Sequence, residues 1–345
     1  MKLATYKDGT RDGQLVVVSR DLSTAHYATG IATRMQQALD DWGFIAPQLQ
    51  DLYETLNNGK ARHAFPFDPA MCMAPLPRAF QWVDGSAYLS HVTTVRTALD
   101  IDLPNDTLET DPLMSQGSGD SFVGAQADIH CANEAMGLDF EAELAVITGD
   151  VPMGASADDA LEAVRLVALV NDVSLRMVAK NELPKGLGYV QSKPATAFAP
   201  VAVTLDELGD AWDNGRVRLT VQSAVNGRKI GMCDAGADMA FHFGQLIAHV
   251  SKTRPVRAGA VFGSGAVSNA PTENKGKQEW PKGASCLMEK RAIEKLLDGK
   301  ASTEYLKASD SVRIEVKGKD GQSVFGAIDQ TVVAPNRSEE RRVGK

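Results

Sequence analysis

The chain has 345 residues and a formal net charge of -8, and 43% of its residues are hydrophobic. Its length is sufficient for a large core and for two domains. The acidic balance, with no Lys/Arg stripe interleaved with aromatic residues, argues against nucleic acid as a partner, and no run reaches the about 18 apolar residues of a membrane span.

The start of the chain, from Met1 to Tyr6, lacks the apolar segment of a secretory signal. Four cysteines are scattered without a C-x-x-C pair: Cys72, Cys131, Cys233 and Cys286. We expect reduced thiols in a cytoplasmic protein, with neither a disulfide framework nor a zinc site.

The first 60 residues predict a small αβ unit. Short apolar runs beside Asp-Gly turns indicate strands over 2–6 and 14–19. Apolar residues at near-helical spacing predict a helix over 27–42. A second helix is expected over 47–57, with Pro47 at its start.

Composition divides the chain into three parts. The segment from Ala64 to Arg78 carries four prolines and is typical of a linker, so we predict a small N-terminal domain over 1–75 and a catalytic domain over 76–335. Residues 336–345 lack apolar periodicity, and the run from Arg337 to Lys345 resembles the translation of a sequencing adapter. An ordinary disordered tail is the alternative, and in either case this segment is excluded from functional reasoning.

The larger domain is predicted to be rich in strands. An Asn-Gly pair within 216–231 and an Asp-Gly pair within 311–333 indicate two hairpins. Helices are expected over 157–165, capped by Ser156, and over 238–250. Because strands and helices do not alternate regularly, the pattern favours an α+β fold with a mixed or antiparallel sheet system.

Two stretches of this domain hold acidic residues among apolar ones. In the first, Asp139, Glu141 and Glu143 recur with a period of two and would share one face of a strand. In the second, Asp172 follows an apolar run. Adjacent carboxylates repel each other, and a hard cation such as Mg²⁺ or Ca²⁺ relieves that repulsion. A solvated strand face is the alternative, but the apolar flanks favour a metal site.

Asp84 and His91 lie seven residues apart in another segment. Asp84 could supply a further carboxylate to a cation, or it could simply form an Asp-Gly turn. His91 could act as a base near neutral pH, or it could be a surface or capping histidine. In a helix the pair would be separated by about 10 Å, which suits a metal ligand and a base on either side of one substrate.

Three further features could contact a substrate. Lys193 lies among small and apolar residues, where an ammonium group needs an anionic partner such as a substrate carboxylate or an enolate; a surface lysine is the alternative. Arg176 could do similar work or pair with an acid. The loop over 263–269 offers backbone N–H groups to an oxygen, although a tight turn is its default interpretation.

Taken together, residues 76–334 resemble the fumarylacetoacetate hydrolase family, and the first 75 residues resemble the small N-terminal domain of its longer bacterial members. The motifs occur in the family's order: the Asp-x6-His pair at Asp84 and His91, the D-x-E-x-E strand at Asp139, Glu141 and Glu143, the N-D-x-S-x-R motif at Asn171, Asp172, Ser174 and Arg176, the lysine Lys193, and the G-S-G-x-x-S loop from Gly263 to Ser268. Each motif alone is weak, whereas five in order are specific.

The resemblance implies a mixed β-roll or β-sandwich catalytic domain that pairs as a homodimer. It also implies a Mg²⁺ or Ca²⁺ site, with Mn²⁺ as a further candidate, on four carboxylates: Asp84, Glu141, Glu143 and Asp172. By the same resemblance, His91 would activate water while Glu289 orients it. Lys193 and Arg176 would stabilise an enolate, and Gly265 and Ala266 would line the substrate site.

Some positions depart from the family pattern. Ser115 stands in a loop where the family often has a substrate-contacting tyrosine, Ala266 replaces a threonine, and Ala179 stands where the eukaryotic hydrolase has a glutamine. The resemblance therefore supports the chemistry better than the substrate.

We expect a metal-dependent hydrolase of a carbon–carbon bond in a β-diketo acid, such as fumarylacetoacetate or an acylpyruvate. One alternative is a 2-oxo acid decarboxylase, or a hydratase or isomerase of a related enol acid. The other is a non-catalytic member that binds a metabolite.

Overall fold

A computed structural model describes residues 1–103 and 107–334 of the chain, so the predicted tail over 336–345 lies outside the described residues. The N-terminal part contains β1 (Lys2–Tyr6), β2 (Gln14–Val18), β3 (Thr24–Tyr27), α1 (Met35–Asp40), α2 (Trp42–Asn57), β4 (Phe65–Pro66) and η1 (Pro69–Met71). The middle of the chain contains β5 (Trp82–Gly85), α3 (Leu89–Leu99), β6 (Met114–Gly117), β7 (Ile129–His130), η2 (Glu134–Met136), β8 (Leu138–Asp139), β9 (Ala142–Thr148), α4 (Ala157–Glu162), β10 (Val164–Asn171), β11 (Ser174–Leu175), α5 (Arg176–Glu182), η3 (Leu183–Lys185) and β12 (Ala197–Phe198). The remainder contains β13 (Ala202–Val203), α6 (Leu205–Leu208), η4 (Gly209–Ala211), β14 (Trp212–Asp213), β15 (Arg216–Val217), β16 (Thr220–Val225), β17 (Arg228–Asp234), α7 (Phe243–Ser251), β18 (Val261–Gly263), β19 (Thr272–Asn274), β20 (Lys277–Glu279), α8 (Leu287–Asp298), β21 (Ser311–Val316) and β22 (Ile328–Val333).

Two sheets organise these elements. The larger has eleven strands in the order β4-β3-β2-β1-β13-β10-β9-β18-β5-β6, with β12 beside β10, and the smaller has the order β17-β16-β21-β22-β7. One face of β9 and β10, carrying Leu144 and Leu169, shares a core with Val221 and Ile314 of the smaller sheet. The strands face each other as in a β-sandwich, and the predicted α+β class with a mixed sheet system is confirmed.

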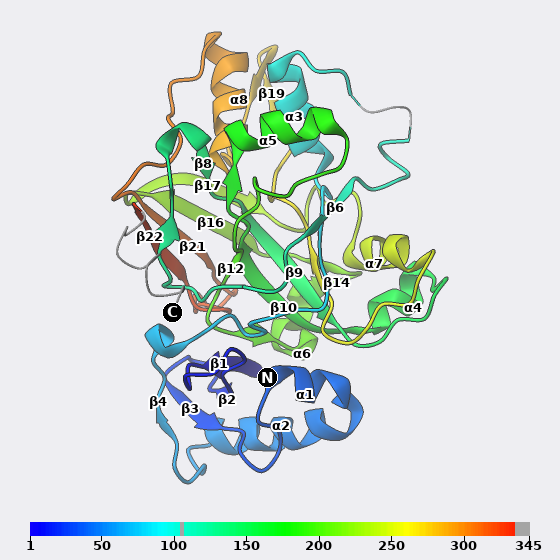
Figure 1. Ribbon diagram of the computed structural model, residues 1–345, viewed down its shortest axis with the longest axis vertical. Coiled ribbons are helices and arrows are strands. Elements are labelled where there is room, and N and C mark those ends of the chain that lie inside the picture. Colours follow the sequence, from blue (N-terminus) through cyan, green and yellow to red (C-terminus); the bar gives the residue numbers. More distant parts are fainter. Residues whose placement is uncertain (104–106, 335–345) are drawn as a thin grey trace, which may run out of the picture.

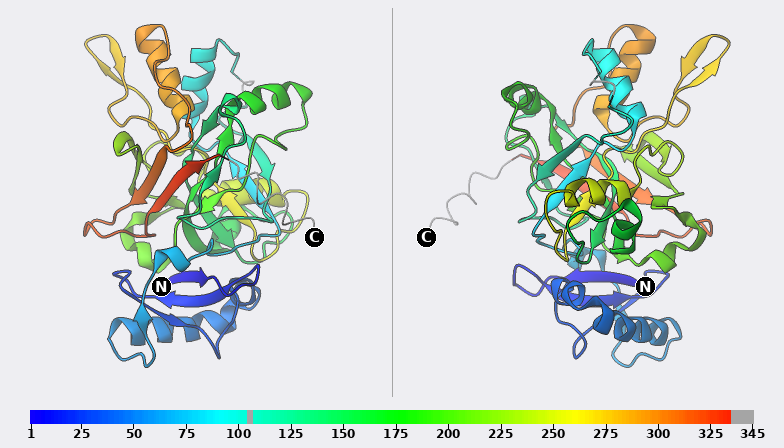
Figure 2. Two further views of the ribbon diagram at one scale, coloured as in Figure 1. Left: turned by 60° about the vertical axis from the view of Figure 1, so that its left-hand side comes forward. Right: turned by 90° about the vertical axis from the view of Figure 1, so that its right-hand side faces the viewer.

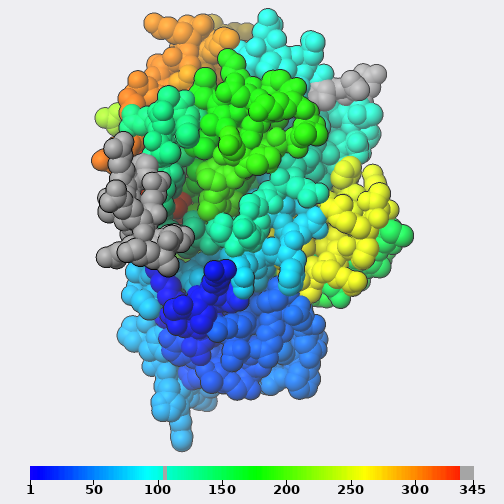
Figure 3. Space-filling view, in the orientation of Figure 1, coloured from blue at the N-terminus to red at the C-terminus, as the bar shows by residue number. Residues whose placement is uncertain are grey.

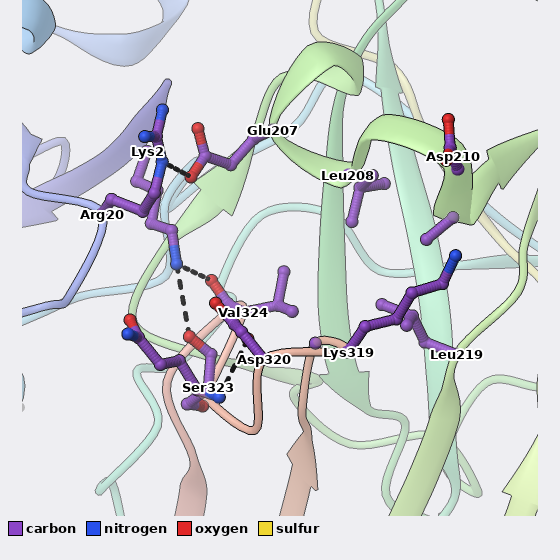
Figure 4. Close-up of a pocket in the computed structure, with 13 residues that line it drawn as sticks. Lys2, Arg20, Glu207, Leu208, Asp210, Leu219, Lys319, Asp320, Ser323 and Val324 are labelled. Atoms are coloured by element: carbon purple, nitrogen blue, oxygen red, sulfur yellow. Dashed lines mark hydrogen bonds and ion pairs between the residues drawn. The ribbon is translucent and has the colours of Figure 1, made fainter.

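The N-terminal strands continue the larger sheet, because β1 pairs with β2 on one side and with β13 on the other. The buried ammonium group of Lys2 strengthens this junction by donating to the carbonyls of Ser323 and Val324, at 3.2 and 2.8 Å (Figure 4). In the space-filling view the N-terminal part packs directly on the rest of the chain (Figure 3). The predicted boundary between an N-terminal domain and a catalytic domain at residue 75 stays a prediction.

Two N-terminal helix predictions need correction. The helix expected over 27–42 is only α1, because β3 pairs with β2 as far as Tyr27 and turns follow it. Helix α2 begins at Trp42, so Pro47 lies inside it and not at its start. The buried face of α2 begins at Ile45, two residues before the proline. Because burial of this face stabilises the first turn, the helix begins before Pro47.

Other predicted elements agree more closely with the structure. Strands β16 and β17 form the first hairpin around Asn226 and Gly227, which both have positive φ as a two-residue turn requires. Strands β21 and β22 form the second hairpin. Helix α4 is capped by Ser156 as predicted, through a capping box that Ser156 forms with Asp159. Helix α7 begins at Phe243, later than predicted, because the residues before it form a capped turn.

Helices α3, α5 and α8 gather at the end of the molecule opposite the N-terminal strands and α2 (Figure 1), and the two rotated views show the same separation (Figure 2). No helix among the described residues is both long and apolar enough to cross a membrane. The four cysteines are unpaired and buried. The helical end of the molecule holds the residues that the sequence singled out.

Candidate active site

Four carboxylates converge beneath these helices. Each of them offers an oxygen within 4.8 Å of the others: Asp84, Glu141, Glu143 and Asp172. Asp84 lies on β5, Glu143 on β9, Glu141 just before β9, and Asp172 directly after β10. The antiparallel pairing of β9 with β10 and the parallel pairing of β18 with β5 bring these chain segments together.

A glycine between the strands allows the carboxylates to approach. Gly263 on β18 lies opposite Asp84 of β5 and Ala145 of β9. A Cβ atom at Gly263 would lie 2.7 Å from Asp84 Oδ1 and 3.1 Å from Glu143 Oε2. Any larger residue would therefore push the two carboxylates apart.

The cluster is short of positive charge. Burial and the neighbouring carboxylates, Asp84 first among them, raise the pKa of Glu143 well above its usual range. Burial, with Asp172 next, raises the pKa of Asp84 to about 7. Both carboxylate oxygens of Glu143 are buried, and neither accepts a hydrogen bond from the described residues. A buried carboxylate without a partner is unfavourable, so this donor set fits an oxygen-binding divalent cation.

Two basic side chains border the cluster. The Lys193 ammonium lies 2.6 Å from Asp172 Oδ2 and 3.0 Å from Glu141 Oε2. The Arg176 guanidinium donates from Nε to Asp139 at 2.8 Å, while its Nη2 lies 2.5 Å from Glu141 Oε1, outside hydrogen-bond geometry. Burial opposes the charge of Glu141, but Arg176 and Lys193 outweigh it and lower the Glu141 pKa. This carboxylate is therefore ionised.

His91 and Glu289 form a pair beside the cluster. His91 Nδ1, on α3, lies 3.1 Å from Glu289 Oε2, on α8. Ser268 donates a 2.5 Å hydrogen bond to the other Glu289 oxygen, and Ser90 donates to Ser268. Burial alone would lower the pKa of His91, but the hydrogen bond to Glu289 and the negative charges of Glu289 and Glu141 together outweigh it and raise the pKa. With Nδ1–H directed at Glu289, Nε2 is the nitrogen left to accept a proton.

One cavity of about 370 Å³ joins these groups. Residues of both the cluster and the pair line it, with others from helices and loops: Asp84, Glu141, His91, Arg176, Lys193, Gly265, Ala266, Ser115, Arg96, Tyr189, Val92, Val95, Leu113, Leu183 and Met288. The structure thus brings together the residues that the sequence proposed for metal, base or substrate contact. Three of them do not line the cavity: Glu143 and Asp172 belong to the carboxylate cluster, and Glu289 pairs with His91.

The Gly-rich loop makes mainly internal hydrogen bonds. The N–H of Gly265 donates to Asp84 at 3.1 Å, Ser264 donates to Leu144, and Val267 donates to Ala142. Gly265 has φ of 76°, and a Cβ there would lie 2.2 Å from the carbonyl oxygen of Gly85. The N–H of Gly265 therefore holds Asp84, which agrees with the tight turn that was the default interpretation of this loop.

Sequence reasoning identified one supporting residue, Asp139, without its partners and missed another, Thr196. Asp139 stands apart from the cluster, because its carboxylate accepts the N–H groups of Leu287 and Met288 at the start of α8. Thr196 donates to Asp172 at 2.6 Å. The D-x-E-x-E spacing identified Asp139 as an acidic residue of interest but did not indicate its hydrogen bonds to α8. No local sequence signal indicated that Thr196 contacts Asp172.

A second cavity, of about 320 Å³, lies at the junction with the N-terminal strands (Figure 4). Two of its lining residues, Arg20 and Glu207, form an ion pair at 3.1 Å, and Lys2 donates to backbone carbonyls. It contains none of the residues predicted for the active site.

Family comparison agrees with this geometry. Residues 81–333 match the profile described as fumarylacetoacetate (FAA) hydrolase C-terminal, and residues 1–78 match the profile described as fumarylacetoacetase N-terminal domain 2. The chain belongs to the fumarylacetoacetate hydrolase family. This confirms the resemblance inferred from the five motifs.

Curated relatives of this fumarylacetoacetate hydrolase family member carry out different reactions. A 2,4-didehydro-3-deoxy-L-rhamnonate hydrolase of Sphingomonas sp. strain SKA58 is 32% identical over 45% of this chain and 51% of its own length. The oxaloacetate tautomerase YisK of Bacillus subtilis is 25% identical over 65% of this chain and 70% of its own length. A mitochondrial oxaloacetate tautomerase, fahd2, of Xenopus laevis is 28% identical over 47% of this chain and 49% of its own length. The match thus spans about half the length of two of these relatives.

Solved structures show the same fold. The fumarylacetoacetate hydrolase of Exiguobacterium antarcticum has a TM-score of 0.65 at 18% identity, covering 97% of this chain and all of that one. The maleylpyruvate hydrolase of Sphingobium sp. SYK-6, in complex with manganese(II) and pyruvate, has a TM-score of 0.62 at 16% identity with the same coverage. The two-layered, sheet-rich fold expected from the sequence is therefore that of the family.

Proposed function

We propose that the chain is a divalent-cation-dependent hydrolase that cleaves a carbon–carbon bond in a β-diketo acid of the fumarylacetoacetate or acylpyruvate type. The observation that carries this proposal is the His91–Glu289 pair facing the same cavity as the carboxylate cluster. Cleavage of a diketone by water needs a base, and an enolate product needs positive charge nearby. The cavity is lined by the base His91 and by two cations, Lys193 and Arg176.

Asp84, Glu141, Glu143 and Asp172 would hold the cation. Mg²⁺ and Ca²⁺ are the first candidates because all four ligands are carboxylates. The manganese(II) in the maleylpyruvate hydrolase structure supports Mn²⁺ as a further candidate. When bound, such a cation would supply Lewis-acid polarisation of the oxo-acid oxygens.

The protein side chains would carry the proton and charge transfers. His91 Nε2 would accept a proton from water, and the resulting hydroxide would add to the distal carbonyl carbon. The bond between that carbon and the next would then break, leaving its electron pair as an enolate beside Lys193 and Arg176. Return of the proton from His91 to the enolate carbon would give a carboxylic acid and an oxo acid, so the atoms and charges balance.

A tautomerase acting on oxaloacetate is the second candidate, motivated by two of the curated relatives. Tautomerisation moves a proton from carbon to oxygen, so it needs a base although it needs no activated water. Decarboxylation of the same acid needs only an oxo acid held in place and its enolate stabilised, so it would depend less on His91.

Wild-type turnover of a β-diketo acid and of oxaloacetate, measured with Mg²⁺ present, distinguishes the candidates, and the variant His91→Ala tests the role of the base. We expect β-diketo acid cleavage to fall about 10²–10⁴-fold, the usual span for a general base. Oxaloacetate decarboxylation, where present, should fall far less, because it needs no base. Equal losses in cleavage and decarboxylation would contradict the assignment of His91 as the water-activating base, and metal binding without turnover would favour a metabolite-binding role. The implied homodimer stays a prediction that light scattering can test.

A further inference from the structure

One face of α3 forms a wall of the active-site cavity. Tyr88 precedes the helix, and His91, Val92, Val95 and Arg96 on it also line the cavity. Their spacing of three, one, three and one residues is that of a single helical face. Arg96 lies five residues beyond His91, which is about 7.5 Å along the helix axis. Arg96 is thus the cavity-lining residue of α3 that lies farthest along the helix from His91.

The three cations that line the cavity differ in their partners. Lys193 and Arg176 each lie within 4 Å of two carboxylates of the chain. Arg96 donates from Nη1 to the backbone carbonyl of Asp102 at 2.6 Å, and no carboxylate of residues 1–103 or 107–334 forms an ion pair with it. A guanidinium has five N–H donors in a fork that matches a carboxylate. Arg96 therefore retains donors for a ligand anion.

Apolar side chains line the cavity between His91 and Arg96 on α3, where Val92 and Val95 lie. Met288 of α8, Leu183 of η3 and Leu113 of the loop before β6 add apolar surface to the same cavity. Such surface favours a short hydrocarbon segment and offers it no hydrogen bond. Along α3 the order is therefore the base, an apolar stretch and a cation.

We propose that Arg96 binds a carboxylate at the far end of the substrate, so that this enzyme selects dicarboxylic oxo acids with a few carbon atoms between their two charged ends. The inference rests on the proposed function for the oxo-acid head, and it adds the chemical class of the tail. Arg96 is on this view a specificity-determining residue that takes no part in bond cleavage.

Binding of two unreactive six-carbon ligands tests the assignment without turnover. 2-Oxoadipate carries a carboxylate where 2-oxohexanoate carries a methyl group, and neither has the second carbonyl needed for cleavage. Calorimetric titration of each ligand, in excess Mg²⁺, compares wild type with Arg96→Gln and Arg96→Lys. Lys180→Gln removes an exposed charge on the neighbouring α5, outside the cavity lining, and serves as the matched control.

We expect wild type to bind 2-oxoadipate about 10- to 100-fold more tightly than 2-oxohexanoate, the range for a charge-assisted hydrogen-bonded pair. Arg96→Gln should remove this preference by weakening only the diacid, Arg96→Lys should keep part of it, and Lys180→Gln should keep all of it. Unchanged affinity for 2-oxohexanoate also shows that the variants remain folded.

Equal wild-type affinity for the two ligands, or equal weakening of both by Arg96→Gln, would overturn the role of Arg96 and leave the proposed hydrolase standing. Failure of wild type to bind either ligand would instead overturn the oxo-acid head site, and with it both proposals.

Discussion

Replacing Asp84 by Asn tests the charge balance of the carboxylate cluster. Asn has nearly the shape of Asp, and its amide oxygen can still accept the hydrogen bond from the N–H of Gly265. The substitution therefore removes one negative charge with little change in packing. Its effect on stability should have opposite signs with and without a bound cation.

The magnitude follows from the pKa of Asp84, which burial and the nearby Asp172 raise from 3.8 to about 7. Between these pH values the folded protein keeps a proton that the unfolded chain releases, so stability falls as pH rises through the window. At about 1.4 kcal/mol per pKa unit, the stability lost by pH 8 is about 4 kcal/mol. Asp84 is partly exposed to the cavity, where water screens its charge, so this figure is an upper bound.

Urea unfolding measures the effect at pH 8 and pH 5, in EDTA and in excess Mg²⁺. In EDTA at pH 8 we expect Asp84→Asn to be about 1–4 kcal/mol more stable than wild type, and at pH 5 the difference should shrink. In Mg²⁺ wild type should gain more stability than the variant, because the variant has lost a ligand.

Asp139→Asn is the matched control. Its carboxylate accepts two N–H groups of α8 and pairs with Arg176, so its loss should destabilise the protein in both EDTA and Mg²⁺. A lower stability of Asp84→Asn than of wild type in EDTA at pH 8 would refute repulsion within the cluster. The same response of both proteins to Mg²⁺ would refute a ligand role for Asp84.

Three further substitutions have distinct expected outcomes. Glu141→Gln should abolish activity and weaken Mg²⁺ binding in a calorimetric titration while the chain stays folded, and unchanged affinity would contradict the ligand assignment. Glu289→Gln removes the partner that holds the pKa of His91 above its usual value against the effect of burial. Since only neutral imidazole acts as a base, the rising limb of kcat/KM should move to lower pH, and an unmoved limb would count against the pair. Burial lowers the pKa of Lys2 from 10.5 to about 8, so the unfolded chain binds more protons in that range and wild-type stability rises there with pH. Urea unfolding should show wild type gaining on Lys2→Met between pH 8 and 10, and a constant difference would contradict the shift.

The sequence predicted those elements of the fold whose signals are local. An Asn-Gly turn and a capping box act within a few residues, so the hairpin around Asn226 and the start of α4 were predicted correctly. The helix expected over 27–42 failed because β3 is stabilised by pairing with β2, a tertiary interaction that overrides helical spacing. A proline inside α2 was tolerated for a similar reason, since the buried face decides where that helix begins.

For the site, the period-two argument identified the acids but not their separate surroundings. Asp139 and Glu141 were expected on one strand face, yet the strand is interrupted between β8 and β9, where the N–H of Ala142 donates to Ser285. This break leaves Asp139 at the start of α8 while Glu141 joins the cluster. Glu289, almost 200 residues from His91, carried no local signal, and only the family resemblance indicated it.

The carboxylate cluster forms a floor of the site that is built on strands, and side chains of the helices form its walls. These two parts differ in how well they should tolerate substitutions. The floor is fixed by a buried chain of hydrogen bonds in which Glu141 N–H donates to Asn171, Asn171 donates to Gln330 of β22, and Gln330 donates to the carbonyl of Ala127. Replacing Asn171 or Gln330, the two side chains in this chain of hydrogen bonds, by an apolar residue would leave a buried polar group unpaired and displace a carboxylate. The walls contribute individual side chains from helix faces, such as Arg96 of α3, whose replacement breaks no buried network. The cation chemistry and the choice of substrate therefore depend on separate structural elements, so substrate preference can change on the helices while the carboxylate cluster stays intact.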